Sequence, residues 1–255
     1  IRRKIKRVII VNEDRLPFIT WDKFKNVKVL EAGVCGLKVC TIKVNYKDKS
    51  YILKEMRPSF RLGRDYMFLD SVKRYFNVSH LGMWRLRSTR KLEQIDKTKK
   101  SLVGNWRFVN DNKVIYCIMN EFENIGDLGK NKEYLKNMAS FKETLKIILF
   151  DGLFRSSDNI LRNILVNKNG EVMSIDEGDI FGKRKNVFSK HDWFKRSENI
   201  SKTKEIAIEI ITQWNLCSKI EMISKKMERF GFTDKIDEMT QRFKNYKKII
   251  EEELV

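Results

Sequence analysis

The sequence contains few of the residues that build metal sites and disulfide frameworks. Only two of its 255 residues are His and four are Cys, and no Cys-x-x-Cys pair is present. Zinc sites need clustered Cys and His, so this sparse set argues against a zinc-binding protein. Four unpatterned Cys also argue against a disulfide scaffold. We therefore expect free thiols in a reducing intracellular compartment, with the cytoplasm favoured and the nucleus or a virion as alternatives.

Proline, glycine and long apolar runs are also scarce. Two Pro and twelve Gly argue against fibrous and loop-dominated architectures. No apolar run approaches the roughly 18 residues that cross a bilayer, so we expect no transmembrane segment. The opening residues 1–11 are basic and then apolar, but they lack a small-residue cleavage site. We interpret them as a strand with a basic lead-in rather than a signal peptide.

The chain is rich in hydrophobic residues and in positive charge. Hydrophobic residues make up 42% of the sequence, with five Trp and sixteen Phe, which excludes a disordered chain and predicts one large or two small domains. Lys and Arg outnumber Asp and Glu by 53 to 34, a net charge of +19. An excess of this size favours nucleic acid, an anionic membrane face or phosphorylated ligands as partners, and it does not choose among them.

The first part of the chain has the alternating pattern of β-strands. Three strands are predicted, at residues 27–33, 37–44 and 51–54. Gly33 and Gly36 lie in the turn between the first two, where any tight hairpin favours glycine. Lys54 lies inside the third strand, where its charged side chain needs either solvent or a partner. On its own, Lys54 is better explained as an exposed edge-strand lysine that discourages aggregation, and only its position in the ordered set of features favours a functional role.

A helix and a further strand complete this half of the sequence. Apolar residues recur at three- and four-residue spacing over 61–77 and predict a helix, and 114–119 predicts a strand. The strand runs into a polar, glycine-containing connector at 120–129. We place the domain boundary there, with a β-rich domain over 1–120 and a helical domain over 121–255.

Between that helix and strand, residues 80–107 are basic and contain Trp84 and Trp106. Such a stretch could neutralise and stack on nucleic acid. A solvated basic loop is the commoner explanation, so nucleic acid is retained as an alternative partner.

The most informative stretch is 155–182, which places three polar residues around a predicted hairpin. Two short apolar runs flank Asn169-Gly170, the signature of a β-hairpin. Asn163 begins the first strand and Asp176 follows the second, so we expect them to be close in space. Asp158 lies five residues before Asn163. Taken alone, these two are more commonly explained as turn residues. Together with Asp176 they favour an oxygen-rich site for Mg²⁺ and phosphate.

The remainder of the chain has helical periodicity. Four helices are predicted, at residues 135–149, 206–214, 218–230 and 235–254. Ser140 with Glu143, and Ser218 with Glu221, are interpreted as capping boxes.

The order of these features resembles the protein-kinase-like superfamily, and within it the phosphoinositide-3/4-kinase-like branch of atypical kinases. Asp158–Ile164 is similar to that branch's Asp-x₄-Asn-Ile loop, and Ile175–Gly182 to its Ile-Asp-Phe-Gly hairpin end. Leu62–Asp65 resembles its Leu-Arg-Gln-Asp. The resemblance covers roughly residues 27–182. It implies an α+β, two-lobed kinase-like fold with a β-rich N-terminal lobe and a helical C-terminal lobe.

The resemblance also implies roles for the singled-out residues. Lys54 would contact the phosphates of ATP, and Asp65 would hold it, with Asp70 as the alternative. Asp158 would be the catalytic Asp that orients the attacking hydroxyl and accepts its proton.

Asn163 and Asp176 would be the Mg²⁺ ligands. The remaining nucleotide-contacting residues implied by the resemblance are Gly33, Gly36, Met119 and Glu121.

The implied activity is an ATP- and Mg²⁺-dependent transfer of phosphate to an alcohol. Protein Ser/Thr is slightly favoured over inositol lipid as acceptor, and the basic segment 183–196 favours an acidic or phosphorylated substrate. Two departures are present: Asn159-Ile160 replaces the branch's Arg-His, and Glu177 replaces its Phe. A pseudokinase that binds a polyanion through its positive charge is therefore the alternative.

Overall fold

The computed structural model describes residues 25–32, 40–56, 62–87, 115–156, 160–175, 180–182 and 186–255. The chain forms two compact units. The first comprises Ile1–Glu55 and Trp84–Ile118, and the second comprises Met56–Met83 and Met119–Val255. The segment 56–83 thus groups with the second unit. The division into two kinase-like lobes at residue 120 stays a prediction.

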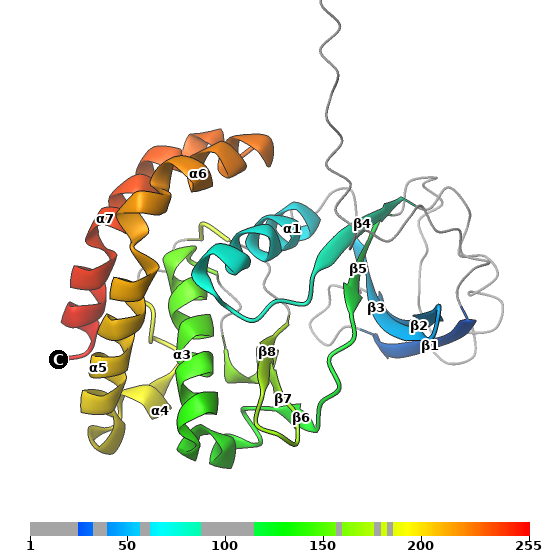
Figure 1. Cartoon of the computed structure of the whole chain (residues 1–255), viewed down its shortest axis with the longest axis horizontal. Helices are drawn as coiled ribbons and strands as arrows, with labels where there is room; N and C mark the ends of the chain where they lie inside the picture. Colours follow the sequence, from blue (N-terminus) through cyan, green and yellow to red (C-terminus); the bar gives the residue numbers. More distant parts are fainter. Residues whose placement is uncertain are drawn as a thin grey trace, which may run out of the picture. The chain divides into compact units, whose positions relative to one another are not determined.

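The first unit is built on a five-stranded sheet with strand order β1-β2-β3-β5-β4 (Figure 1). Its strands are β1 (Lys25–Ala32), β2 (Cys40–Tyr46), β3 (Lys49–Met56), β4 (Met83–Arg87) and β5 (Ile115–Asn120). β1 pairs with β2, and β2 with β3, both antiparallel. The three predicted antiparallel strands and the predicted strand near 114–119 are confirmed. β4 was not predicted, because its sequence alternates apolar with basic residues inside a stretch dominated by charge.

The β2–β3 hairpin is closed by a two-residue turn. Lys47 and Asp48 both have left-handed backbone, with φ of 46° and 61°, between the paired residues Tyr46 and Lys49. This is the combination of a type I′ turn, whose twist matches that of the strands it joins.

The second unit is mainly helical and also contains a small three-stranded sheet. Its helices are α1 (Leu62–Lys73), α3 (Met138–Leu153), α4 (Asp192–Lys195), α5 (Ser197–Trp214), α6 (Leu216–Arg229) and α7 (Ile236–Glu253). Its 3₁₀ turns are η2 (Arg74–Phe76), η3 (Lys132–Lys136), η4 (Leu161–Asn163) and η5 (Thr233–Lys235). The strands β6 (Gly126–Asp127), β7 (Ile164–Val166) and β8 (Val172–Ser174) form an antiparallel sheet. The mixed α+β class is therefore confirmed, as are the helices predicted from periodicity.

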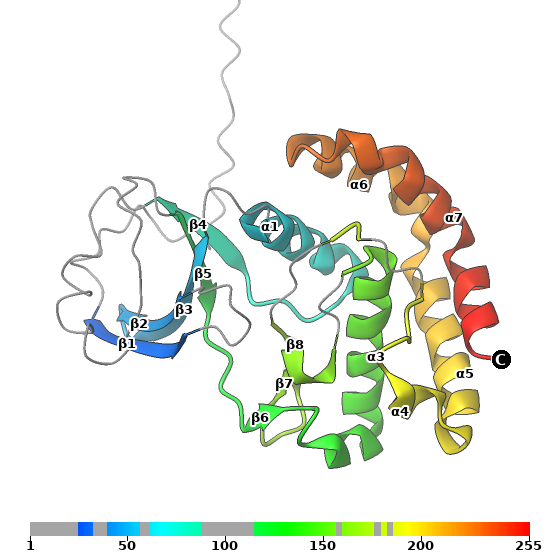
Figure 2. The same cartoon turned by 180° about the vertical axis from the view of Figure 1, so that it is seen from behind.

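Helix α3 is the centre of the second unit. It stands between the β7–β8 hairpin and α5 (Figures 1 and 2), and most of its side chains are buried. Aromatic rings fill the space at its C-terminal end: the centroid of Phe76 lies 5.4 Å from that of Phe150 and 5.2 Å from that of Trp214. Edge-to-face contacts of this kind add to the stabilisation from apolar burial. The core therefore holds the last turn of α3, which leads directly into the loop of Asp158.

Both predicted capping boxes are wrong. Asn137 caps α3, and Ser140 instead donates from its hydroxyl to the carbonyl of Gly170. The error arises because η3 ends just before Asn137, so the helix begins three residues earlier than the Ser-x-x-Glu pattern indicates.

At the second predicted box, α6 starts at Leu216 directly after Asn215, whose left-handed backbone ends α5. The hydroxyl of Ser218 therefore donates to the carbonyl of Asn215 inside the helix, and Glu221 pairs with Lys225. In the part of the chain that the structure describes, no helix is long and apolar enough to cross a membrane.

Candidate active site at the β7–β8 hairpin

The predicted hairpin is confirmed. β7 and β8 pair antiparallel, with Ile164 opposite Ser174 and Val166 opposite Val172. The turn begins at Asn167, whose side-chain oxygen accepts from the backbone N–H groups of Asn169 at 2.9 Å and Glu171 at 3.0 Å. An asparagine that bonds the backbone beyond it is the usual way to start such a turn.

Glycine is required at position 170 for two reasons. Gly170 has a φ of +82°, which favours glycine over any residue with a side chain. A Cβ there would also lie 2.8 Å from the hydroxyl oxygen of Ser140. Ser140 donates to the Gly170 carbonyl at 2.6 Å, so the tip of the hairpin is fixed to the first turn of α3.

Asn163 lies at the open end of the hairpin. It is the last residue of η4 and is half-buried, and its backbone carbonyl accepts from the N–H of Ile175 at 2.8 Å. Ile175 directly precedes Asp176 in the sequence. The pairing therefore joins Asn163 to the residue that precedes Asp176 in the sequence.

Several predicted site residues lie outside the described residues. These are Gly33, Gly36, Asp158 and Asp176. The roles that the resemblance implies for them stay predictions. Among the described residues there is no group of three or more His, Cys, Asp or Glu that could hold a metal ion.

The predicted phosphate-contacting lysine and its partner belong to different units. Lys54 lies in β3, where its backbone pairs with Thr41 of β2. Asp65 lies in the first turn of α1, as predicted, and is only 4% exposed. The alternative acid, Asp70, is also buried and accepts from the backbone N–H of Gly82 at 3.2 Å. Asp70 therefore has a structural role that connects α1 to the chain after η2.

The two predicted nucleotide-contacting residues near the domain boundary lie around the end of β5. Met119 is 3% exposed, and Glu121 is half-buried just after the strand. Between them, Asn120 donates from its side chain to the carbonyl of Leu81 at 2.8 Å. The connector then joins the hairpin sheet, since the N–H of Ile125 donates to the carbonyl of Val166 at 2.9 Å.

The segments that flank Asp158 and Asp176 are hydrogen-bonded to each other. The N–H of Phe181 donates to the carbonyl of Phe154 at 2.9 Å, and that of Gly182 to the carbonyl of Arg155 at 3.3 Å. The guanidinium of Arg155 also donates to the carbonyl of Phe181 at 3.3 Å. The start of one predicted catalytic segment is therefore tied to the end of the other.

Two residues at this junction have strained backbone. Arg155 and Phe181 have φ values of 54° and 59°, in the left-handed region that residues with long or bulky side chains rarely occupy. Each such residue costs roughly 1–3 kcal/mol and persists only where its surroundings hold it, and such residues concentrate at functional sites. Both residues lie at the ends of the segments that carry the two predicted motifs.

Two side chains of helix α7 contact this junction. Glu238 forms an ion pair with Arg155, with 2.5 Å between Oε1 and Nη1. Arg242 donates to the last carbonyls of α3, from Nη2 to Gly152 at 2.7 Å and from Nε to Leu153 at 3.1 Å. Cations at a helix C-terminus bond its free carbonyls and complement its dipole. The end of α3 and the loop that follows are therefore positioned by side chains almost 90 residues away.

The side chain of Arg242 is half-buried, which affects how strongly it must be hydrogen-bonded. Burial lowers the pKa of Arg242, and the nearby Tyr246 opposes that shift. An arginine remains charged at neutral pH, so a desolvated guanidinium must be held by strong hydrogen bonds. Charge-assisted bonds of this kind contribute about 1.5–3 kcal/mol each.

One face of the hairpin is apolar and partly exposed. Leu165 and Met173 are directly opposite each other and half-buried, whereas their neighbours along both strands point into the core. Sequence reasoning missed this pair, although the alternation of the two strands could have separated the two faces. It also missed Arg155, Glu238 and Arg242, for which the sequence carries no signal.

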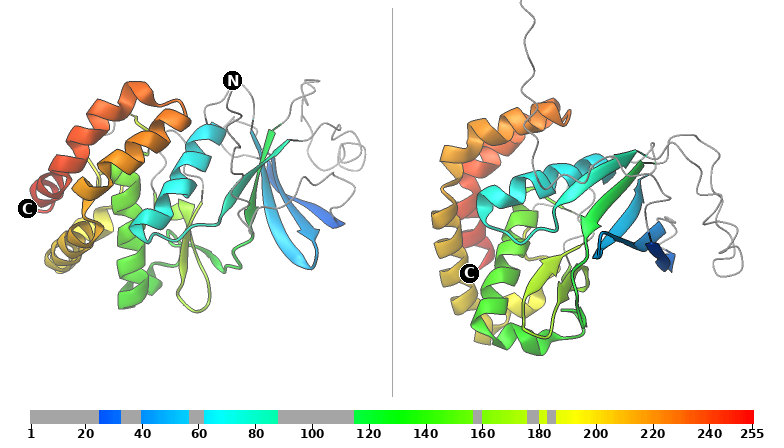
Figure 3. Two further views of the ribbon diagram at one scale, coloured as in Figure 1. Left: turned by 45° about the horizontal axis from the view of Figure 1, so that its top comes forward. Right: turned by 45° about the vertical axis from the view of Figure 1, so that its right-hand side comes forward.

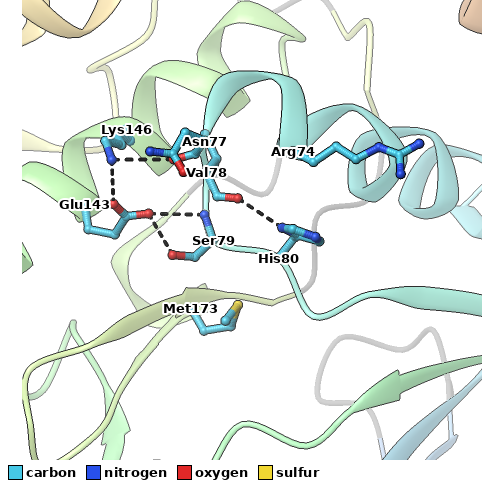
Figure 4. A pocket seen from close by; sticks show the side chains of 8 residues that line it. All are labelled: Arg74, Asn77, Val78, Ser79, His80, Glu143, Lys146 and Met173. Atoms are coloured by element: carbon cyan, nitrogen blue, oxygen red, sulfur yellow. Dashed lines mark hydrogen bonds and ion pairs between the residues drawn. The ribbon is translucent and has the colours of Figure 1, made fainter. Parts of the chain in front are cut away.

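A pocket of about 480 Å³ lies beside the hairpin, between the chain after η2 and helix α3 (Figure 4). Its lining residues are Arg74, Asn77, Val78, Ser79, His80, Glu143, Lys146 and Met173. Glu143 accepts from the backbone N–H of Ser79 at 3.1 Å and from its hydroxyl at 2.7 Å, and it pairs with Lys146 at 2.9 Å. These contacts connect the chain after η2 to α3, and they give the Glu143 carboxylate a structural role.

No protein-family model matches the chain, and no curated protein matches it either.

Proposed function

We propose that the protein is an ATP- and Mg²⁺-dependent phosphotransferase with a two-lobed, kinase-like fold. It transfers the γ-phosphate to a hydroxyl group, with protein Ser/Thr favoured over inositol lipid. The observation that supports this best is the 2.8 Å hydrogen bond between Ile175 N–H and the Asn163 carbonyl. It joins the two predicted motifs at the mouth of one hairpin, as the proposed metal site requires.

The donor set at this mouth fits Mg²⁺. Asn163 would contribute an amide oxygen and Asp176 a carboxylate, and hard oxygen ligands are those that Mg²⁺ prefers. When bound, the ion neutralises negative charge on the phosphate oxygens of ATP. The apolar pair Leu165 and Met173, on the exposed face of the same hairpin, suits contact with a planar purine ring.

The remaining residues position the reactants and balance their charge. Asp158 orients the acceptor hydroxyl and accepts its proton, and Lys54 pairs with the phosphates while Asp65 holds it. Arg155 is a positioning residue: through Phe181 and Glu238 it holds the segments on either side of the two motifs. Phosphoryl transfer depends mainly on such positioning and on electrostatic stabilisation.

The proposal predicts that Asp158→Ala lowers phosphate transfer from labelled ATP by about 10²- to 10⁴-fold, the usual contribution of a general base. Asp234→Ala is the matched control, because Asp234 is an exposed acid on η5 of the same unit. The two variants should unfold at the same urea concentration as the wild type to within a few tenths of 1 M. Undiminished transfer by Asp158→Ala contradicts the assignment of the base.

The alternative is an inactive kinase-fold protein that binds a polyanion, which the net charge of +19 favours. A thermal-shift assay separates the two functions. A rise in melting temperature that needs both ATP and Mg²⁺, and that is lost in Asp176→Asn, supports the phosphotransferase. Absence of a shift, together with polyanion binding that weakens steeply with salt, supports the alternative.

A further inference from the structure

Three cationic side chains rest on two successive aromatic residues where η2 meets α6. The guanidinium carbon of Arg74 lies 5.1 Å, and the Nζ of Lys226 5.4 Å, from the ring centroid of Tyr75. The Nζ of Lys219 lies 5.9 Å from the ring centroid of Phe76. Helix α6 runs beside α1 (Figure 3), and the two are in contact. The cations therefore come from two elements and gather on one face of the second unit.

The spacing of these charges follows from helix geometry. Lys219 and Lys226 are seven residues apart, which puts them on the same side of α6 and roughly 10 Å apart along its axis. Arg74 and Lys226 share one ring and lie within about 10 Å of each other, close to the Debye length at 0.1 M salt. We call Arg74, Lys219 and Lys226 the cationic cluster.

No carboxylate of the described chain forms an ion pair with the cationic cluster. The nearest acids on α6 are Glu221 and Glu228. Glu221 pairs with Lys225, with 2.5 Å between the charged atoms. Glu228 follows Lys226 by two positions, which places it about 200° around the helix. Three like charges at this spacing repel one another, so an anion that binds among them is stabilised.

The aromatic rings hold the cations in place without neutralising them. Contact with a ring attracts the cation and restricts a long, flexible side chain. The ring of Tyr75 already contacts Arg74 and Lys226, so it is not free to stack on a base. The groups that a ligand meets are therefore the positive charges of the three side chains. The cluster therefore recognises anionic groups rather than stacked bases.

We propose that the cationic cluster binds the phosphate backbone of a nucleic acid without regard to base sequence. Hot spots of protein partners and interfacial membrane helices insert apolar or aromatic side chains. The exposed large apolar side chains of the described chain are Ile125, Met138 and Val255, and none of them lies on η2 or α6. Phosphate binding needs cations alone. The proposal does not depend on the phosphotransferase activity.

The test is fluorescence anisotropy of a labelled single-stranded oligo(dT) with the full chain, titrated at several salt concentrations. The variant Arg74→Gln/Lys219→Gln/Lys226→Gln removes the cluster. Its affinity at about 0.1 M salt should fall at least tenfold, and the slope of log K against log salt should become less steep by about 2, since each phosphate contact contributes about 0.7. The matched control is Lys244→Gln/Lys247→Gln/Lys248→Gln, which removes the same charge from α7 and should bind within about threefold of the wild type.

The outcomes separate the explanations. Equal losses in the two triple variants would mean that binding follows net charge alone and would overturn the site. Undiminished binding by the cluster variant, no binding by the wild type, or tighter binding of polyglutamate or anionic vesicles than of oligo(dT) would overturn it as well. If the cluster variant melts at a lower temperature than the control, the single variant Lys226→Gln decides, with an expected slope change of about 0.7.

Discussion

The two ends of α3 are stabilised in different ways. At the N-terminus, the side chain of Asn137 accepts from two backbone N–H groups of the first turn, at 2.8 and 3.3 Å. At the C-terminus, Arg242 of α7 donates to the carbonyls of Gly152 and Leu153. The first contact joins residues two or three positions apart and is exposed or part-buried. The second joins residues about 90 positions apart, is part-buried, and lies just before the loop of Asp158.

This difference indicates where the fold determines the proposed site. A local cap forms wherever the helix forms, so it carries no information about the rest of the chain. The Arg242 contact exists only when α7 has packed against α3. The position of the loop that follows α3, and of Arg155 within it, therefore depends on the complete second unit.

The largest effect is expected at the C-terminal end. Arg242→Ala removes the side-chain donor from the buried carbonyls of Leu153 and Gly152, of which Gly152 keeps the N–H of Arg155 at 3.2 Å. It should lower the free energy of unfolding by about 1–3 kcal/mol. Urea denaturation measures this change. Arg229→Ala, at an exposed arginine of α6, is the control and should change stability by less than about 0.5 kcal/mol. Equal effects of the two substitutions would contradict the special role of the C-terminal end.

The second prediction separates strain from positioning. Arg155→Gly removes the contacts with Glu238 and Phe181, while glycine adopts the left-handed backbone without strain. The lost contacts destabilise the protein and the relief of backbone strain stabilises it, so the free energy of unfolding should change by less than about 1 kcal/mol. Under the proposed function, kcat should fall by roughly 10- to 100-fold, because the loop loses its precise placement.

The Michaelis constant for ATP should stay within about twofold of the wild type, since a positioning residue does not contact the nucleotide. Glu238→Gln tests the ion pair alone and should give a smaller loss of kcat. An unchanged kcat in Arg155→Gly would remove Arg155 from the proposed mechanism. Absence of turnover by the wild type would instead contradict the proposed function.

A smaller effect is expected at the N-terminal end. Asn137→Ala removes the cap of α3 and should destabilise the protein by about 1 kcal/mol. Turnover should be unaffected, because the capped turn lies at the far end of the helix. Asn137→Asp keeps an acceptor oxygen and should restore most of the stability. A loss of kcat in Asn137→Ala, with the fold intact, would show that the two ends are coupled.

The smallest effect concerns the exposed pair between Lys142 of α3 and Glu209 of α5, at 2.7 Å. The hydrogen bond from Lys142 lowers the pKa of Glu209 below its usual value of 4.5. The ion pair therefore stabilises the folded state fully at pH values above 4.5, the usual pKa of Glu209. Its contribution is lost as the pH falls through the lowered pKa of the folded state. Glu209→Gln should be slightly less stable than the wild type at pH 7 and equal to it in acid. A difference that persists at low pH would contradict this assignment.

The sequence predicted the local features of the fold well. The Asn-Gly pair between two apolar runs was sufficient to predict the β7–β8 hairpin, and the acid at Asp65 to predict the first turn of α1. Where two local signals competed, it failed: Ser140 with Glu143 has the pattern of a capping box, but Asn137 is the cap. Asn137 and Ser140 are both residue types that suit an N-cap, and only the end of η3 at Lys136 decides that the helix starts after Asn137.

Within the candidate site, the sequence by itself determined the hairpin and hence that its two open ends would meet, since turn length and alternation set the register of a hairpin. The bond between Ile175 N–H and the Asn163 carbonyl agrees with this, while the closeness of Asn163 and Asp176 stays a prediction. Only the tertiary structure decided that Arg155 and Phe181 would take left-handed backbone and contact each other. It also decided that Glu238 would pair with Arg155 and that Arg242 would bond to the carbonyls of Gly152 and Leu153. The physical reason is the range of the interactions. Turns and helix caps form between neighbours, whereas contacts between residues tens of positions apart leave no periodic trace and form only when the helices have packed.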